Sequence, residues 1–183
     1  TKGLDRDFVS ANHEVLRDEI RRARAASDGV IGVNVMSAVS DHARLLETAV
    51  ESGADLLLLG AGLPRLPLSV ARVVKEVPTR FAVIVSSLRA MQIIFQLWSR
   101  RYSTVPDAVV VEGPLAGGHL GFSREQLFDP AFSLESLLPP IVAEAARMET
   151  VHEKPIPVIA AGGIFTGSDI RRMFSLGAQG VQM

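Results

Sequence analysis

The sequence contains no cysteine, and this absence removes several kinds of chemistry at once. Without thiolates the chain forms no disulfide, no cysteine nucleophile, no iron–sulfur cluster and no cysteine-ligated zinc site. Histidine is also scarce, with four residues in 183, and no two of them have the i, i+4 spacing of a helical metal site. We therefore expect no bound metal ion.

Neither sign of charge dominates the sequence. It has 19 Lys and Arg residues against 20 Asp and Glu residues, so no long-range field would gather a phosphate backbone or anionic lipid. No apolar run approaches the roughly 18–20 residues that cross a bilayer, and the polar start is unlike a signal peptide. We expect a cytoplasmic protein that binds neither nucleic acid nor a membrane.

Short β-branched or Leu-rich runs are what the sequence has in abundance, each bounded by Gly or Pro and followed by a helix-periodic stretch. The runs are apolar throughout, which is typical of strands covered on both faces in parallel sheets and barrels. The expected strands are Val30–Val35, Asp55–Gly60, Phe81–Val85, Ala108–Val111, Ile156–Ala161 and Gly180–Met183.

Helix signals separate these runs. The clearest helix is expected over Leu88–Tyr102, where an apolar stripe predicts packing against a barrel. The stripe consists of Met91, Ile94, Phe95 and Trp98. Further helices are expected over Asp41–Glu51 after Ser40, from Pro67 to Glu76, near Ser133–Met148, and over Asp169–Leu176 after Ser168.

Six βα units in a row fit either a doubly wound sheet or part of an eight-stranded barrel. A complete barrel typically takes about 250 residues. We therefore favour one domain over residues 1–183, an incomplete (β/α)₈ TIM barrel that lacks its first strands and its C-terminal part. Because such a barrel cannot close by itself, we expect the isolated chain to fold or bind ligand weakly.

A glycine-rich turn, Gly162–Asp169, leads from the fifth expected strand into a helix. Backbone amides without bulky side chains, together with the positive helix end, are typical of a phosphate cradle, and barrels commonly place one after strand 7 or 8. A plain βα turn is the alternative. The other glycine-rich turn, Gly60–Pro64, lacks the third glycine of a dinucleotide fingerprint and indicates a tight turn.

The strongest local signal is the loop Glu112–Gly121, in which an acidic residue ends a strand and four glycines surround one histidine. Glycines let the backbone approach a flat ligand, and histidine accepts a proton near neutral pH. We predict catalysis by His119 rather than an ordinary loop histidine. The other histidines lack this context, and we expect them to be solvated: His13 and His42 in first turns of helices, and His152 in a polar loop.

Two further features are left with alternatives. Asn34 is a polar residue inside an apolar run, which indicates either a rim position facing a polar ligand or a turn-capping amide. The long loop Phe122–Phe132 is typical of functional loops, and a lid role stays open.

Three segments together resemble the nitronate monooxygenase (2-nitropropane dioxygenase) family and its flavin-type enoyl-acyl-carrier-protein reductase relatives: Gly32–Asn34, Glu112–Gly121 and Ala161–Ile164. The resemblance implies a (β/α)₈ barrel that binds FMN non-covalently over the carboxyl ends of its strands. By that resemblance the FMN contacts are Asn34, Glu112, Gly117, Gly118, Gly162, Gly163, Gln182 and Met183. The chain departs from the family at Pro114-Leu115, where relatives often have an acidic residue, and it ends before the family's Gly-Thr phosphate pair.

The resemblance also implies a reaction, in which His119 is the base toward a nitroalkane or binds its nitronate, and FMN and O₂ convert the nitronate to a carbonyl compound and nitrite. Reduction of an enoyl thioester by NADH or NADPH through FMN is the alternative, and Glu112 in place of Gln favours it slightly. A barrel that binds FMN without turnover is a third reading. Oligomeric state cannot be read from the residues, so a homodimer stays open.

Overall fold

The structure is a computed structural model that describes the backbone of residues 2–183 and the side chains from residue 8 onward. The chain forms two compact units, one ending at Phe81 and the other spanning Ala82–Met183. Over the residues described, no helix is long and apolar enough to cross a membrane.

The N-terminal unit pairs two parallel strands, β1 and β2, in the register Gly32↔Leu56 to Met36↔Gly60. Its elements are α1 Lys2–Ala26, β1 Gly32–Met36, α2 His42–Glu51, β2 Leu56–Gly60 and α3 Leu68–Val73. Asp55 joins them, since its carboxylate accepts from the Ile31 amide at 2.7 Å and from Arg24 of α1 at 2.5 Å. These two hydrogen bonds, the first above all, lower the pKa of Asp55.

The expectation of solvated histidines is wrong for two residues of this unit. His13 lies in the middle of α1 rather than in a first turn, is 3% exposed, and its Nδ1 lies 3.0 Å from Thr48 Oγ1 on α2. His42 does begin α2, but its two ring nitrogens lie 3.1 Å from the Met36 carbonyl and 3.2 Å from the Arg65 carbonyl. Both rings therefore connect segments of the unit.

The C-terminal unit contains parallel strands in the order β3, β4, β5, β6, with β3 starting just before the unit. The strands are β3 Arg80–Val85, β4 Ala108–Glu112, β5 Val158–Ala161 and β6 Gly180–Gln182. Each overlaps its expected run. β5 starts later than expected because Pro157 has no N–H to donate to a ladder, although its carbonyl accepts from Val109 at 3.0 Å.

Helix α4, Leu88–Tyr102, has the bounds that the sequence predicts, and its apolar stripe is buried as expected. The stripe residues Met91, Phe95 and Trp98 are fully buried, so the helix packs its apolar face inward. The Ser87 side chain caps the helix by accepting from the Ala90 amide at 3.2 Å.

Two other helices correct the expectations. Helix α5, Leu134–His152, extends beyond Met148, so His152 ends a helix and does not lie in a polar loop. Helix α6, Gly167–Ser175, is capped by Thr166 rather than by Ser168. The reason is a reciprocal capping box in which Thr166 and Asp169 satisfy each other's backbone amides.

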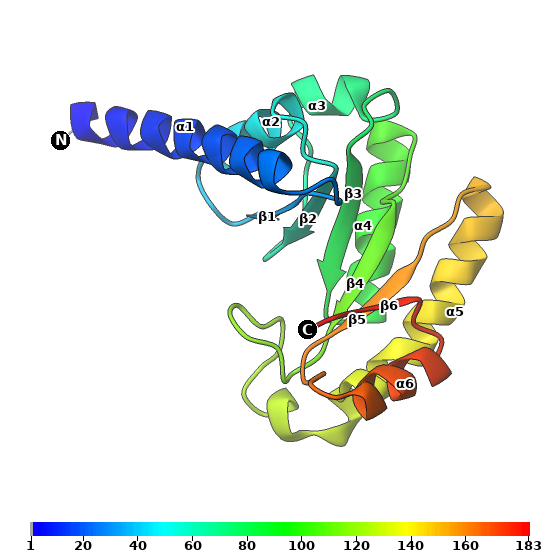
Figure 1. Ribbon diagram of the computed structural model, residues 1–183. Coiled ribbons are helices and arrows are strands. Elements are labelled where there is room, and N and C mark those ends of the chain that lie inside the picture. Colours follow the sequence, from blue (N-terminus) through cyan, green and yellow to red (C-terminus); the bar gives the residue numbers. More distant parts are fainter. Residues whose placement is uncertain (1) are drawn as a thin grey trace. The chain divides into compact units, whose positions relative to one another are not determined.

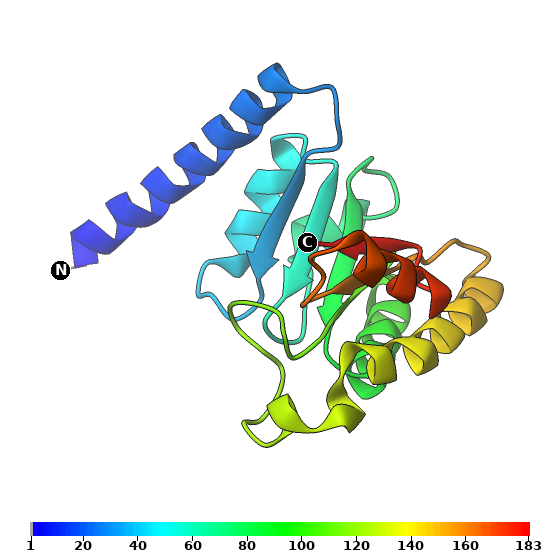
Figure 2. The same ribbon diagram turned by 60° about the horizontal axis from the view of Figure 1, so that its bottom comes forward.

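The segment between β4 and α5 lies at the end of the strands toward which the arrows point (Figure 1). With this end turned forward, it is an extended loop that becomes helical before α5 (Figure 2). The helical parts are two single 3₁₀ turns, η1 Gln126–Phe128 and η2 Pro130–Phe132. The rings of Phe122 and Phe132 meet edge to face at 6.4 Å, so the expected long loop is folded upon itself.

Candidate active site at the strand ends

The strand register of the C-terminal unit aligns three residues at the carboxyl ends of neighbouring strands. Glu112 of β4 pairs with Ala161 of β5, and Ala161 pairs with Gln182 of β6. Neighbouring strands lie about 4.8 Å apart, so Glu112 and Gln182 flank Ala161 at one level of the sheet. In parallel α/β sheets and barrels this end carries the ligand site.

A hollow of about 320 Å³ opens at this level, and we call it the rim hollow. Its volume is at the lower end of the roughly 300–1,000 Å³ of small-molecule sites. It is lined by Glu112, Leu115, Ala116, Gly117, Ala161, Gly162, Gly163, Ile164, Phe165, Gln182 and Met183. The hollow therefore brings together Glu112, Gly117 and the Gly162–Gly163 pair, which sequence reasoning had singled out separately.

Two large apolar residues of the lining were missed by sequence reasoning. Leu115 is 74% exposed and Phe165 is 78% exposed, although both are large and apolar. Neither belongs to a periodic pattern, because each stands in a loop. Only the approach of the two loops reveals them as walls of the rim hollow.

The two glycine loops around the rim hollow interlock through their backbones. Gly162 has φ +97° and Gly163 has φ +72°, values that side chains other than glycine rarely adopt. A Cβ at Gly162 would lie 2.8 Å from the Ala116 amide nitrogen, and one at Gly163 would lie 2.9 Å from the Leu115 side chain. The glycine pair is thus required for loop packing, independently of any ligand.

The start of α6 is occupied by a carboxylate of the chain itself. Asp169 accepts from the amides of Phe165 and Thr166 at 3.2 and 2.9 Å and from the Thr166 hydroxyl at 2.8 Å. These hydrogen bonds, that of the Thr166 hydroxyl first, lower the pKa of Asp169. A phosphate at this turn would therefore be left with the Gly162–Gly163 backbone rather than with those two amides.

Glu112 is the acidic residue of the rim hollow, and it is half-buried. Burial raises the pKa of its carboxyl group, because removing a carboxylate from water disfavours the charged form. Among the residues whose side chains are described, no hydrogen bond or ion pair holds this carboxylate. Glu112 therefore takes up a proton more readily than a surface glutamate does.

The remaining predicted residues lie outside this lining. His119 is exposed on the loop after β4, two residues beyond Gly117. Gly118, beside it, has φ +84°, and no heavy atom lies within 4 Å of the place where its Cβ would stand. Asn34 belongs to the N-terminal unit, where it is exposed on β1 in register with Leu58. The structure thus groups the predicted β4–β6 residues but does not place Asn34 among them.

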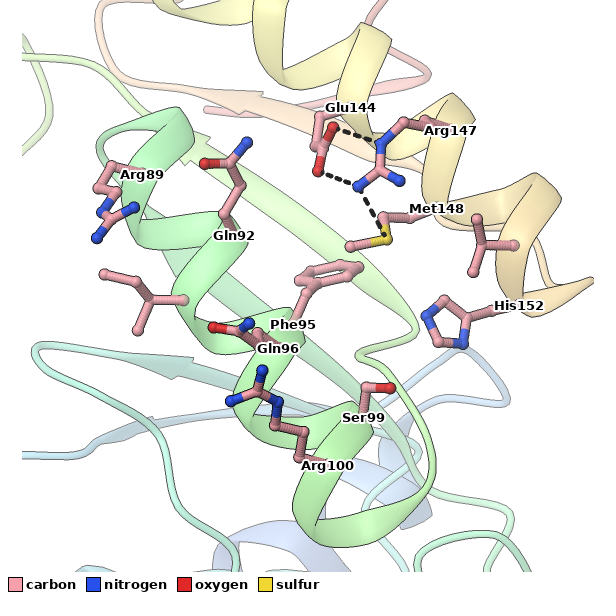
Figure 3. Close-up of a pocket in the computed structure, with 12 residues that line it drawn as sticks. Arg89, Gln92, Phe95, Gln96, Ser99, Arg100, Glu144, Arg147, Met148 and His152 are labelled. Carbon is pink, nitrogen blue, oxygen red and sulfur yellow. Dashed lines mark hydrogen bonds and ion pairs between the residues drawn. The ribbon is translucent and has the colours of Figure 1, made fainter.

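A larger cavity of about 480 Å³ lies between α4 and α5, and we call it the helix groove (Figure 3). Arg147 binds Glu144 through two parallel hydrogen bonds of 2.9 and 2.8 Å, and Arg89 and Arg100 extend from α4. The ion pair with Arg147 lowers the pKa of Glu144. The helix groove contains none of the predicted site residues except the neighbourhood of His152, which lines it.

Neither cavity contains a cluster of metal-ligating side chains. Over the described part of the chain, no group of three or more His, Asp or Glu residues could hold a metal ion. The chemistry of the rim hollow must therefore be argued from its backbone amides, its carboxyl group and the neighbouring histidine loop.

Parallel strands that alternate with helices and carry a glycine-lined hollow at their carboxyl ends define an α/β protein of the TIM-barrel type. FabK from Thermotoga maritima is similar, with a TM-score of 0.69 and 28% identity over 93% of this chain and 46% of that one. Nitroalkane oxidase from Streptomyces ansochromogenes has the same fold, with a TM-score of 0.71 and 22% identity over 93% of this chain and 54% of that one. The expected fold class is confirmed, and the chain corresponds to part of such a barrel.

The chain belongs to the nitronate monooxygenase family, whose sequence model, described as "Nitronate monooxygenase", matches residues 8–183. A protein named "Probable nitronate monooxygenase" from Staphylococcus aureus (strain JH9) is 42% identical over 78 residues. That stretch covers 42% of this chain and 19% of the relative, so the chain matches about a fifth of the relative's length. The family expected from the three sequence segments is confirmed.

Proposed function

We propose that the protein oxidises alkyl nitronates with FMN and O₂, giving a carbonyl compound and nitrite, with His119 as the catalytic base. One observation carries the proposal: in a member of this family, the predicted cofactor residues of three strands surround one hollow at the strand ends. The loop that begins in the lining of this hollow continues directly into His119.

The residues of the rim hollow fit FMN. Gly117 lines the hollow, and no heavy atom lies within 4 Å of the place where its Cβ would stand, so a side chain there would fill space beside the hollow. The Gly162–Gly163 backbone would hold the phosphate, and Glu112, Gly118, Gln182 and Met183, with Asn34 of the N-terminal unit, complete the proposed contacts. When bound, FMN would supply the electron transfer between nitronate and O₂.

His119 would remove the proton next to the nitro group or hold the resulting anion. Imidazole is the side chain suited to accept and return a proton near neutral pH. The exposed position of His119 leaves its ring accessible to a small substrate. Glu112, which takes up a proton readily, would offer a donor to an electron-rich ligand atom.

Reduction of an enoyl thioester by NADH or NADPH through FMN is a second candidate. The observation that favours it is the acidic Glu112, where nitronate-oxidising relatives carry Gln or Glu. In that reaction the same hollow would bind FMN, but a nicotinamide would be the reductant. A barrel that binds FMN without turnover would share the hollow and give no product.

Product analysis with the full-length protein tests these candidates. Incubation with FMN, O₂ and an alkyl nitronate should produce nitrite, whereas NADH or NADPH with an enoyl thioester should be consumed no faster than without protein. Nicotinamide consumption that depends on the enoyl thioester would replace the first proposal by the second. Tight FMN binding without either product would leave the non-catalytic barrel.

A further inference from the structure

Ser86, the residue that follows β3, contacts the far end of the histidine loop. Its hydroxyl donates to the Gly121 carbonyl at 3.2 Å. A Cβ at Gly121 would lie 2.2 Å from the Ser86 Oγ and 3.0 Å from its Cβ. Side-chain contacts essentially never fall below 3.0 Å, so only glycine at position 121 allows this approach.

The near end of the same loop is fixed by different contacts. The Gly113 amide donates to the Ala161 carbonyl at 2.9 Å. A Cβ at Gly113 would lie 2.8 Å from the Leu134 Cβ, so the loop leaves β4 in close contact with the start of α5. Between the two ends, Gly117 and Gly118 have open space where their side chains would be. His119 thus stands in the open part of the loop, two residues from the Ser86 contact.

We propose that Ser86 is a positioning residue that sets the place of His119 by holding the Gly121 carbonyl. The proposal rests on the proposed function in that it takes His119 as the catalytic base. A catalytic group displaced by about 1 Å can lose about 10²-fold in rate. A loop that carries its base between two flexible glycines therefore needs a fixed point close to that base, and Ser86 supplies it.

Three variants of the full-length protein test the contact. Ser86→Ala should lower kcat/KM by about 3- to 10-fold, the effect of losing one neutral hydrogen bond. Gly121→Ala should lower it by about 10²-fold, because the new methyl group displaces the loop. The double variant Ser86→Gly with Gly121→Ala should recover most of that loss, because the atoms that the methyl group would meet are gone.

Ser87→Ala is the matched control, since the neighbouring hydroxyl caps α4 by accepting from the Ala90 amide and touches no part of the loop that we can assign. Its kcat/KM should stay within about twofold of the parent value, as expected for a change outside the site. An equal loss in Ser87→Ala and Ser86→Ala would contradict a specific role of Ser86.

Amide hydrogen exchange of the flavin-free protein gives a readout independent of activity. In Ser86→Ala the amides of residues 117–121 should exchange about 3- to 10-fold faster, while those of residues 134–152 stay unchanged. Unchanged exchange in the loop would overturn the proposal, and so would failure of Ser86→Gly to relieve Gly121→Ala. If Gly121→Ala does not fold, the exchange result of Ser86→Ala decides.

The two proposals can fail separately. If His119→Ala keeps full activity, His119 is not the base and the proposed function fails, whatever the exchange experiment shows about Ser86. If His119→Ala loses activity but Ser86→Ala and Gly121→Ala do not, the proposed function stands and the positioning role of Ser86 is wrong.

Discussion

The rim hollow and the helix groove of the C-terminal unit differ in what holds their charges. In the helix groove Glu144 is bound by Arg147, and this pairing lowers the pKa of the carboxyl group. In the rim hollow Glu112 has no such partner among the described side chains, and burial raises its pKa. Paired charges mainly hold helices together, whereas an uncompensated carboxyl group in a cleft is a feature of functional sites. The smaller and less charged cavity is therefore the better candidate site.

The largest expected effect comes from replacing the histidine next to each cavity. His119→Ala should lower the rate of nitrite formation from a nitronate by about 10²- to 10⁴-fold, because a general base is lost. His152→Ala removes a histidine that lines the helix groove and should change the rate by less than about twofold. Nitrite formation at saturating nitronate and O₂ is the measurement, and similar losses in both variants would contradict the assignment of the rim.

The next effect concerns the glycines of the phosphate turn. Gly162→Ala places a methyl group 2.8 Å from the Ala116 amide nitrogen at φ +97°, a strain of about 1–3 kcal/mol. FMN affinity, measured by fluorescence titration, should fall by about tenfold or more. Gly167→Ala is the control, because the nearest atom to its new methyl group is the flexible end of Arg171 at 3.7 Å. FMN affinity unaffected by Gly162→Ala would sever the turn from the cofactor site.

The two glutamates should respond to pH with opposite signs. Because the pKa of Glu112 is raised above its ordinary 4.5, its contribution to stability is complete below 4.5 and is lost as pH rises through the folded-state pKa. Glu112→Gln should therefore unfold at higher urea than the parent protein at pH 7, and the difference should shrink as pH falls toward 4.5.

Glu144 provides the opposite case. Because its pKa is lowered from 4.5, its stabilising contribution is present above 4.5 and is lost as pH falls through the folded-state pKa. Glu144→Gln should be less stable at pH 7 by less than about 1 kcal/mol, the size of a partly exposed ion pair. Urea unfolding of both variants across this pH range measures the two signs, and a common sign would show that the two carboxyl groups do not differ in environment.

The smallest effect is expected for activity after a change in the helix groove. Arg147→Met keeps the apolar stem but removes the ion pair with Glu144. The kcat/KM for a nitronate should stay within about twofold of the parent value, because Arg147 lies on α5 and not at the strand ends. A tenfold loss would show that the groove takes part in the reaction.

Much of this arrangement could be predicted from local sequence, and the reason is periodicity. Helix α4 was predicted with its bounds and its buried stripe, because apolar spacing and the caps at Ser87 and Ser103 act within one segment. The strands were located within a few residues because apolar runs between glycines and prolines mark buried parallel strands. The loop Glu112–Gly121 was recognisable by its composition alone.

The misplaced features depend on contacts between distant residues. His13 is buried because α1 packs on α2, where Thr48 lies 35 positions away in the sequence. The contact of Ser86 with Gly121 also joins residues 35 positions apart, and no pattern in either segment indicates it. The cap of α6 was assigned to Ser168 because both Thr166 and Ser168 are good caps, and only the reciprocal bonds with Asp169 decide between them.

Anaerobic flavin reduction in the full-length protein tests the central claim most directly. The FMN-loaded protein is mixed with an alkyl nitronate in one experiment and with NADH or NADPH in another, while the flavin absorbance is followed. The account predicts rapid loss of the oxidised flavin band with the nitronate, slowed by at least about 10²-fold in His119→Ala, and little change with the nicotinamides. Rapid reduction by a nicotinamide and none by the nitronate would contradict it.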